Sequence, residues 1–203
     1  ENTRREAAES EAAGLRGRLR RLEQDTFDLR RQVAQNQAQA MSDSLTGLPN
    51  RRAYEQRMQQ EYARWRRFGE PLALVVWDVD NFKSINDTFG HKSGDKALAM
   101  IAKILRSRLR ETDFVARYGG EEFVTLLTGA DGQAALQVAD AMRTAVEDGG
   151  LHANGQPVTI TLSGGVSVFA AGDSPEGVFE RADRAMYQAK RHHCGFSFYT
   201  AER

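Results

Sequence analysis

The most constraining feature of this sequence is an unbroken apolar run, residues 72–77, that stops abruptly at Asp78-Val79-Asp80. A strand without polar alternation is covered on both faces, so helices should pack on both sides of its sheet. Strand side chains alternate, which places Asp78 and Asp80 on one face at the strand end. Two such carboxylates repel each other unless a cation lies between them, which favours a divalent-ion site. The alternative is that Asp78 caps the following helix.

The rest of the globular part mixes helical and strand patterns. A polar stretch over residues 81–94 follows the apolar run, and Gly164-Gly165 indicates a bulge or a close backbone approach. Hairpin-joined strands combined with crossover helices predict an α+β sandwich with a mostly antiparallel central sheet flanked by helices. The expected helices are 51–68, 95–110, 133–147 and 175–191, and the other expected strands are 114–118, 123–127, 158–168 and 196–199.

Residues 1–41 differ from the remainder and carry a heptad pattern. They contain no proline and are dense in Glu, Arg, Gln and Ala. Apolar residues at alternating spacings of three and four form one narrow seam on a helix, which favours a parallel dimeric coiled coil. A solvated single helix, or a linker packed on its own domain, is the alternative. The seam positions are Ala8, Ala12, Leu15, Leu19, Leu22, Thr26, Leu29, Val33 and Ala40. We therefore expect a stalk over 1–41 and a globular domain over 42–203.

Composition excludes several classes of partner. The 28 basic and 28 acidic residues cancel, which argues against nucleic acid. No apolar run approaches the roughly 18 residues of a membrane span, and there is no signal-peptide pattern. The single cysteine, Cys194, allows no intrachain disulfide and fits a reducing compartment, so a cytoplasmic location is expected. The sequence begins at Glu1 without a methionine, which leaves room for an upstream sensor or membrane segment.

A second acidic cluster follows two glycines. Gly119-Gly120 predicts a type I′ hairpin turn with positive φ at both residues, and Glu121 and Glu122 would lie at its tip. Taken alone, this could be an ordinary solvated hairpin. Together with Asp78 and Asp80 it suits two-metal phosphoryl or nucleotidyl transfer. Lys83 and Lys190 are plausible counter-charges for a triphosphate, and Asn86 and Asp95 could hydrogen-bond a purine edge.

Four separate motifs in this order resemble the GGDEF family of diguanylate cyclases, in its GGEEF variant: residues 43–51, 78–91, 94–95 and 117–123. The resemblance covers about residues 42–200. It implies a fold similar to nucleotidyl cyclases and polymerase palms. It also implies a reaction that joins two GTP into cyclic di-GMP with release of pyrophosphate, using Mg²⁺ or possibly Mn²⁺. The family's active centre is split between two subunits, which gives the heptad seam a purpose as a homodimer contact.

The resemblance also implies residue roles. Asp78 and Glu121 would bind the metal with the Val79 carbonyl, and Glu121 or Glu122 would help activate the 3′-hydroxyl. Arg110 and Asp113 resemble the family's Arg-x-x-Asp site for inhibition by product, although a locally paired helix-end arginine is the alternative. The implied substrate contacts are Asn86 and Asp95 on guanine, Lys83 and Lys190 on phosphate, and the motif residues His91, Gly119 and Gly120.

One segment departs from the family pattern. Cys194 stands where an arginine that contacts the triphosphate is usual, and Arg191 could substitute for it or phosphate affinity could be lower. His192, His193 and Cys194 lack a second ligand pair at metal spacing, so a solvated helix end is favoured over a metal site. Two other functions stay open: a catalytically weak receptor for cyclic di-GMP, and a dimeric module that relays a signal. A regulatory protein on the stalk fits either.

Overall fold

The structure is a computed structural model that describes residues 2–153, 155–192 and 197–199. The chain divides into two compact units, Glu1–Met41 and Ser42–Arg203. In the part of the chain that is described, no helix is long and apolar enough to cross a membrane.

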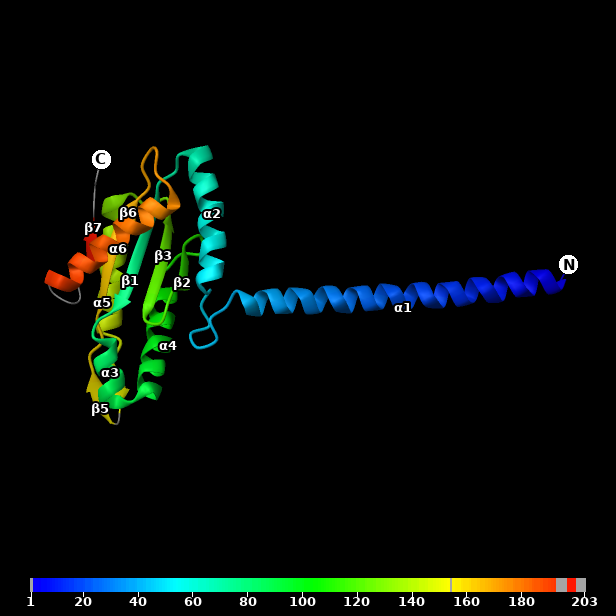
Figure 1. Cartoon of the computed structure of the whole chain (residues 1–203), viewed down its shortest axis with the longest axis horizontal. Helices are drawn as coiled ribbons and strands as arrows, with labels where there is room; N and C mark the ends of the chain where they lie inside the picture. Colours follow the sequence, from blue (N-terminus) through cyan, green and yellow to red (C-terminus); the bar gives the residue numbers. More distant parts are fainter. Residues whose placement is uncertain (1, 154, 193–196, 200–203) are drawn as a thin grey trace. The chain divides into compact units, whose positions relative to one another are not determined.

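The first unit is one helix, α1 (Asn2–Ala40), drawn in blue in Figure 1. The larger seam residues lie on its surface with more than half of their area exposed: Leu15, Leu19, Leu22, Leu29 and Val33. This exposed apolar stripe agrees with the heptad interpretation. Pairing with a second chain stays a prediction.

A five-stranded sheet in the order β2-β3-β1-β6-β7 forms the centre of the second unit. β1 is the middle strand and pairs antiparallel with β3 and β6, β2 pairs antiparallel with β3, and only β6 and β7 run parallel. The predicted mostly antiparallel α+β sheet is confirmed. The strands are β1 (Leu72–Val79), β2 (Phe114–Arg117), β3 (Glu122–Thr128), β6 (Leu162–Val168) and β7 (Ser197–Tyr199); β4 (Leu151–Ala153) and β5 (Gln156–Val158) form a separate pair.

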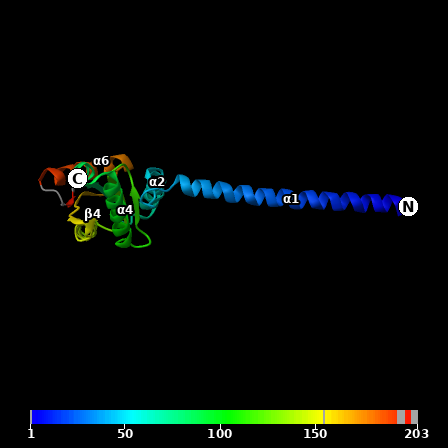
Figure 2. The ribbon, with the colours of Figure 1, turned by 90° about the horizontal axis from the view of Figure 1, so that it is seen from below.

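Helices cover both faces of the sheet, as the apolar run predicted. Alternate β1 residues enter two different cores. Ala73, Val75 and Trp77 pack with α4 (His91–Ser107) and α5 (Gly132–Glu147). Leu72, Leu74 and Val76 pack on the other side with α2 (Arg51–Phe68) and α6 (Pro175–His192), so that α4 and α6 lie on opposite sides of the sheet (Figure 2).

The chain path differs from the expected bounds at two places. The polar stretch after β1, for which no helix bounds were predicted, contains α3 (Phe82–Phe89), which buries Phe82 and Ile85. The long strand expected over 158–168 is split into β5 and β6, with residues 159–161 outside both. Of the two interpretations of Gly164-Gly165, the close approach is correct, because pairing of β6 with β1 continues through both glycines without a bulge.

Candidate active site

The carboxylate of Asp78 lies at the end of β1 between two neighbouring strands. The antiparallel register places Asp78 opposite Glu122 of β3 and opposite Ser163 of β6. The ammonium group of Lys190, from α6, donates a hydrogen bond to Asp78 Oδ1 and forms an ion pair with it. Burial raises the pKa of Asp78, and the pairing with Lys190 opposes that effect only in part. Asp78 therefore pairs with a lysine and does not cap the following helix.

Gly165 determines how closely α6 approaches this strand end. A Cβ atom at Gly165 would overlap two backbone atoms of α6, the carbonyl oxygen of Ala182 and the amide nitrogen of Met186. Ala182, Met186 and Lys190 follow one another at spacings of four and share a face of the helix. Direct contact between the α6 and β6 backbones thus carries Lys190 to Asp78.

The hairpin of residues 118–122 is wider than the sequence predicted. Neither Gly119 nor Gly120 has positive φ, so the expected two-residue type I′ turn is wrong. The amides of Tyr118 and Gly119 both donate to the Glu122 carbonyl, at 2.8 and 3.3 Å, and close a longer loop. Glu121 and Glu122 are half-buried, so their side chains lie partly inside the site rather than free at a tip.

Arg117 ties this loop to a distant turn, and sequence reasoning did not find it. Its Nη1 donates to both carboxylate oxygens of Asp43 at 3.0 Å, while Nε and Nη2 donate to the Gly120 carbonyl at 3.2 and 2.7 Å. Asp43 also accepts bonds from the amide and hydroxyl of Thr46. Burial raises the pKa of Asp43, but the bonds from Thr46 and Arg117 outweigh it, so the pKa lies below its ordinary value. Asp43 and Arg117 are 74 positions apart in the sequence, so their contact leaves no local pattern to detect.

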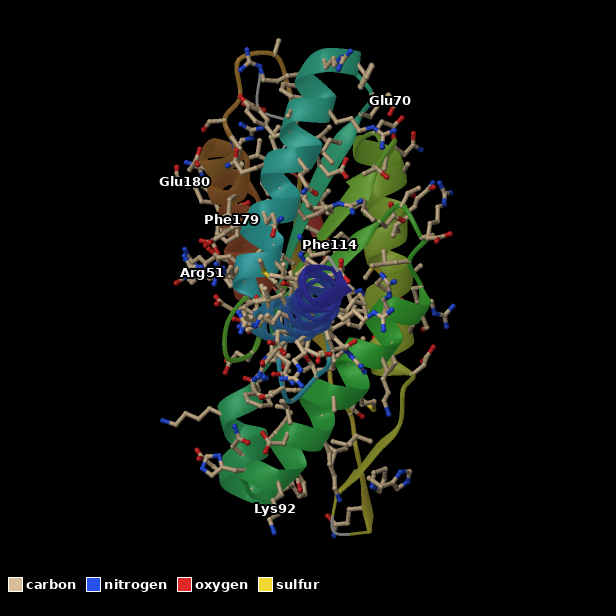
Figure 3. The ribbon with its side chains drawn as sticks, turned by 90° about the vertical axis from the view of Figure 1, so that its right-hand side faces the viewer. Arg51, Glu70, Lys92, Phe114, Phe179 and Glu180 are labelled. Atoms are coloured by element: carbon tan, nitrogen blue, oxygen red, sulfur yellow. The ribbon has the colours of Figure 1, made fainter. Side chains whose placement is uncertain are left out.

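Tyr118 fixes the other side of the loop through aromatic packing. Its ring lies 4.9 Å from that of Phe179 of α6 and 5.6 Å from that of Tyr54 of α2, centroid to centroid. The guanidinium carbon of Arg51 lies 4.7 Å from the Tyr118 ring centroid, a cation–π distance. Figure 3 shows Arg51 and Phe179 close together where α2 meets α6. The glycines therefore follow a firmly packed residue.

Three carboxylates, those of Asp78, Glu121 and Glu122, lie close enough at this end of the sheet for the charge of Asp78 to affect the pKa of both glutamates. Burial raises the pKa of Glu121, and the charges of Asp78 and Glu122 raise it further. Burial and the charge of Asp78 likewise raise the pKa of Glu122. Lys190 lowers both. The site thus holds more negative than positive charge, as expected where a cation binds.

The donor chemistry fits a hard divalent ion. Among the described residues, no three His, Cys, Asp or Glu side chains are grouped closely enough to hold a metal by themselves. The set expected from the sequence needs only two such side chains, from Asp78 and Glu121, plus the backbone oxygen of Val79. Oxygen ligands of this kind suit Mg²⁺, which retains waters and binds through one or two carboxylates together with substrate phosphates.

Of the two residues expected to contact guanine, Asn86 lies on α3 and Asp95 in the first part of α4. A Cβ at Gly94 would overlap Asn86 Oδ1, so the Asn86 amide crosses directly over the glycine that precedes Asp95. Asn86 is half-buried and Asp95 is exposed in the first part of α4. Lys83 on α3 and His91 at the start of α4 are both exposed. Only a glycine at position 94 permits this arrangement.

The Arg110–Asp113 pair lies at the turn between α4 and β2. Asp113 is 8% exposed, and its carboxylate accepts hydrogen bonds from the amides of Arg110 and Thr128, both at 3.2 Å. Arg110 is exposed. Asp113 therefore stabilises the turn through its hydrogen bonds, while Arg110 is exposed to solvent. The sequence did not distinguish these two positions. Cys194 and His193 lie outside the described residues.

The family comparison covers strands β1, β2, β3 and β6 of this sheet and the carboxylates at its end. The family model described as "Diguanylate cyclase, GGDEF domain" matches residues 40–195, and the chain belongs to that family. The resemblance seen in the sequence is confirmed.

Individual relatives extend the comparison. The chain is 46% identical over 177 residues to diguanylate cyclase DgcP of Pseudomonas aeruginosa, covering 87% of this chain and 26% of that protein. It is 40% identical over 161 residues to the response regulator PleD of Caulobacter vibrioides, covering 74% of this chain and 34% of that one. The chain thus spans about a quarter to a third of the length of these relatives.

Solved structures with the same fold include two whose alignments extend into α1. The coiled coil and GGDEF domain of DgcB from Caulobacter crescentus, in complex with c-di-GMP, aligns with a TM-score of 0.87 at 29% identity, over 92% of this chain and 99% of that one. Diguanylate cyclase SiaD from Pseudomonas aeruginosa, in complex with its activator SiaC, aligns with a TM-score of 0.77 at 35% identity, over 98% of this chain and 79% of that one.

Proposed function

We propose that this chain is a diguanylate cyclase that condenses two GTP into cyclic di-GMP with release of pyrophosphate. The observation that carries the proposal is the convergence of Asp78 with Glu121 and Glu122 beside Lys190. Membership of the family, and 46% identity to a diguanylate cyclase, support the same reaction.

The proposed metal ligands are Asp78, Glu121 and the Val79 carbonyl. Bound Mg²⁺ or Mn²⁺ would supply positive charge to the phosphate oxygens. Glu121 or Glu122 would accept the proton of the attacking 3′-hydroxyl. A carboxylate whose pKa is raised by burial and neighbouring charge is a stronger base than an ordinary glutamate, so both residues suit this role.

Guanine would be held by Asn86 and Asp95 at the α3–α4 junction. A carboxylate accepts from the N1–H and amino group of guanine, whereas adenine presents a bare ring nitrogen there. The fixed position of Asn86 over Gly94 supports a preformed site. Lys83 and Lys190 would contact the phosphates, and Gly119, Gly120 and His91 would line the nucleotide.

The complete active centre would require two chains. We propose that 1–41 is a dimerisation stalk and 42–203 the catalytic domain. The exposed seam of α1 supports pairing, which would bring two GTP-loaded domains to a high local concentration. The likeness to SiaD, solved with its activator, also supports a regulatory protein partner. A cytoplasmic location is proposed because GTP is a cytoplasmic substrate.

Incubating the purified chain with GTP and Mg²⁺, and separating the nucleotides by chromatography, tests the reaction. Cyclic di-GMP should accumulate together with pyrophosphate, and only when metal is present. The protein must be at a concentration where sedimentation shows a dimer. A dimeric, folded protein that consumes no GTP would contradict cyclase activity. In that case tight cyclic di-GMP binding would favour the receptor function, and its absence would favour the signal-relaying module.

Arg110 offers a test of product inhibition. Its exposed guanidinium suits the guanine and phosphate of cyclic di-GMP. Arg110→Ala should raise the product concentration that halves the rate by about tenfold or more, the loss of one charged contact of ~1.5–3 kcal/mol. Progress curves with added cyclic di-GMP measure this. The initial rate without product should stay near wild type, and unchanged inhibition would place the product elsewhere.

A further inference from the structure

Asp80 lies one residue beyond the end of β1 and is only 4% exposed. Its two carboxylate oxygens accept hydrogen bonds from the hydroxyls of Thr161 and Ser163, each at 2.7 Å. No lysine or arginine among the described residues forms an ion pair with it. Burying a carboxylate without a cation is costly, and the two charge-assisted bonds offset that cost only in part. A residue of this kind needs an explanation beyond packing.

The orientation of the peptide group between Val79 and Asp80 explains why a buried carboxylate is placed here. The amide N–H of Asp80 donates to the Thr161 carbonyl at 3.0 Å, on the β6 side. In a trans peptide the N–H and C=O point in opposite directions, so the Val79 carbonyl must point away from β6. The Val79 amide also points to that other side, because it donates to the Glu121 carbonyl at 3.2 Å. The Val79 carbonyl therefore faces the hairpin that carries Glu121.

Beyond the Asp80–Thr161 backbone hydrogen bond, the described β1–β6 ladder gives this peptide no further support. The ladder between β1 and β6 ends at the pair Val79–Leu162. Asn81 follows with φ 53° and ψ 29°, the only positive φ at a non-glycine residue in the described part of the chain. The chain turns out of the strand through this left-handed conformation, and an anchor just before the turn helps to hold that path.

We propose that Asp80 is a positioning residue for the metal-dependent reaction. With Thr161 and Ser163 it locks the Val79–Asp80 peptide, so that the Val79 carbonyl is aimed at the ion position beside Glu121. Asp80 is only 4% exposed, and its two oxygens face hydroxyls of residues 161 and 163. The proposal therefore gives it an effect through the Val79 carbonyl rather than a contact with metal or substrate. The inference rests on the proposed function and assigns to Asp80, Thr161 and Ser163 the control of divalent-ion affinity.

Three variants of the full chain test this: Asp80→Asn, Thr161→Val and Ser163→Ala. Electron paramagnetic resonance measures Mn²⁺ binding with a non-hydrolysable GTP analogue, alongside cyclic di-GMP synthesis and thermal unfolding. Each variant should weaken Mn²⁺ binding and lower kcat by about tenfold or more, the usual effect of losing an outer-shell partner. Thr161→Ser keeps the hydroxyl and should restore wild-type Mn²⁺ affinity. If Asp80→Asn does not fold, the two hydroxyl variants carry the test.

A matched control separates positioning from stability. Thr125→Val removes another buried hydroxyl, which accepts a bond from Trp77 Nε1 at 3.0 Å in the middle of the sheet. It should lower the melting temperature without changing Mn²⁺ affinity. Variants of the Asp80 cluster that lose melting temperature but keep Mn²⁺ affinity and kcat would overturn the proposal. Weakened Mn²⁺ binding supports it even where wild type makes no product, an outcome that counts against cyclase activity alone.

Discussion

Glu121→Gln should reduce cyclic di-GMP synthesis by more than about 100-fold while leaving the domain folded. Glutamine has the same shape but no charge, so the proposed ion loses one of its two side-chain carboxylates. Even outer-shell partners of a metal are worth about 10–100-fold, and a direct ligand should exceed that. The change also removes a carboxylate whose pKa is raised by burial and by the charges of Asp78 and Glu122. Its charged form is therefore disfavoured in the folded protein, so the melting temperature should stay level or rise. Product chromatography and a thermal melt measure the two effects.

Glu70→Gln is the matched control for this substitution. Glu70 lies on the surface before β1, labelled in Figure 3, where its carboxylate pairs with Arg64 at 3.1 Å and is 59% exposed. Exposed pairs of this type contribute little, so turnover and stability should both match wild type. Near-normal synthesis by Glu121→Gln would remove Glu121 from the metal set. A joint loss of folding and activity would show a structural role instead.

The sequence predicted those parts of the site that depend on local pattern. The apolar run predicted β1 and placed Asp78 at its end, because a strand buried on both faces appears in the sequence as a continuous apolar run. Gly164-Gly165 indicated either a bulge or a close backbone approach, because glycine inside a strand marks one or the other. The identity of the close neighbour, α6, needed the structure.

Long-range polar contacts and short helices were not predictable in the same way. α3 has only eight residues and buries just Phe82 and Ile85, too few for a periodic signal. Asp78 and Asp80 were grouped as one carboxylate pair because they share a face. In the structure the two carboxylates have different partners: Asp78 forms an ion pair with Lys190, whereas Asp80 accepts hydrogen bonds from two hydroxyls. Spacing along one strand cannot reveal which residues arrive from α6 and β6.

Gly165→Ala should destabilise the domain by about 3 kcal/mol, a lowering of roughly 6–12 °C in melting temperature. The added Cβ would overlap the Ala182 carbonyl oxygen and the Met186 amide nitrogen. Both are backbone atoms, so no side-chain rotation can relieve the overlap and α6 must move outward. Calorimetry or a thermal melt monitored by circular dichroism measures the loss.

The same displacement should reduce activity in molecules that remain folded, because Lys190 lies on α6 and pairs with Asp78. Gly177→Ala is the matched control on α6. Its Cβ would meet nothing closer than Ser174 Oγ at 3.6 Å, and alanine favours a helix over glycine, so stability should hold or rise slightly. If Gly165→Ala melts like wild type, β6 and α6 are not in direct backbone contact. A melting loss with full activity at low temperature would mean that Lys190 reaches its site without help from the close approach.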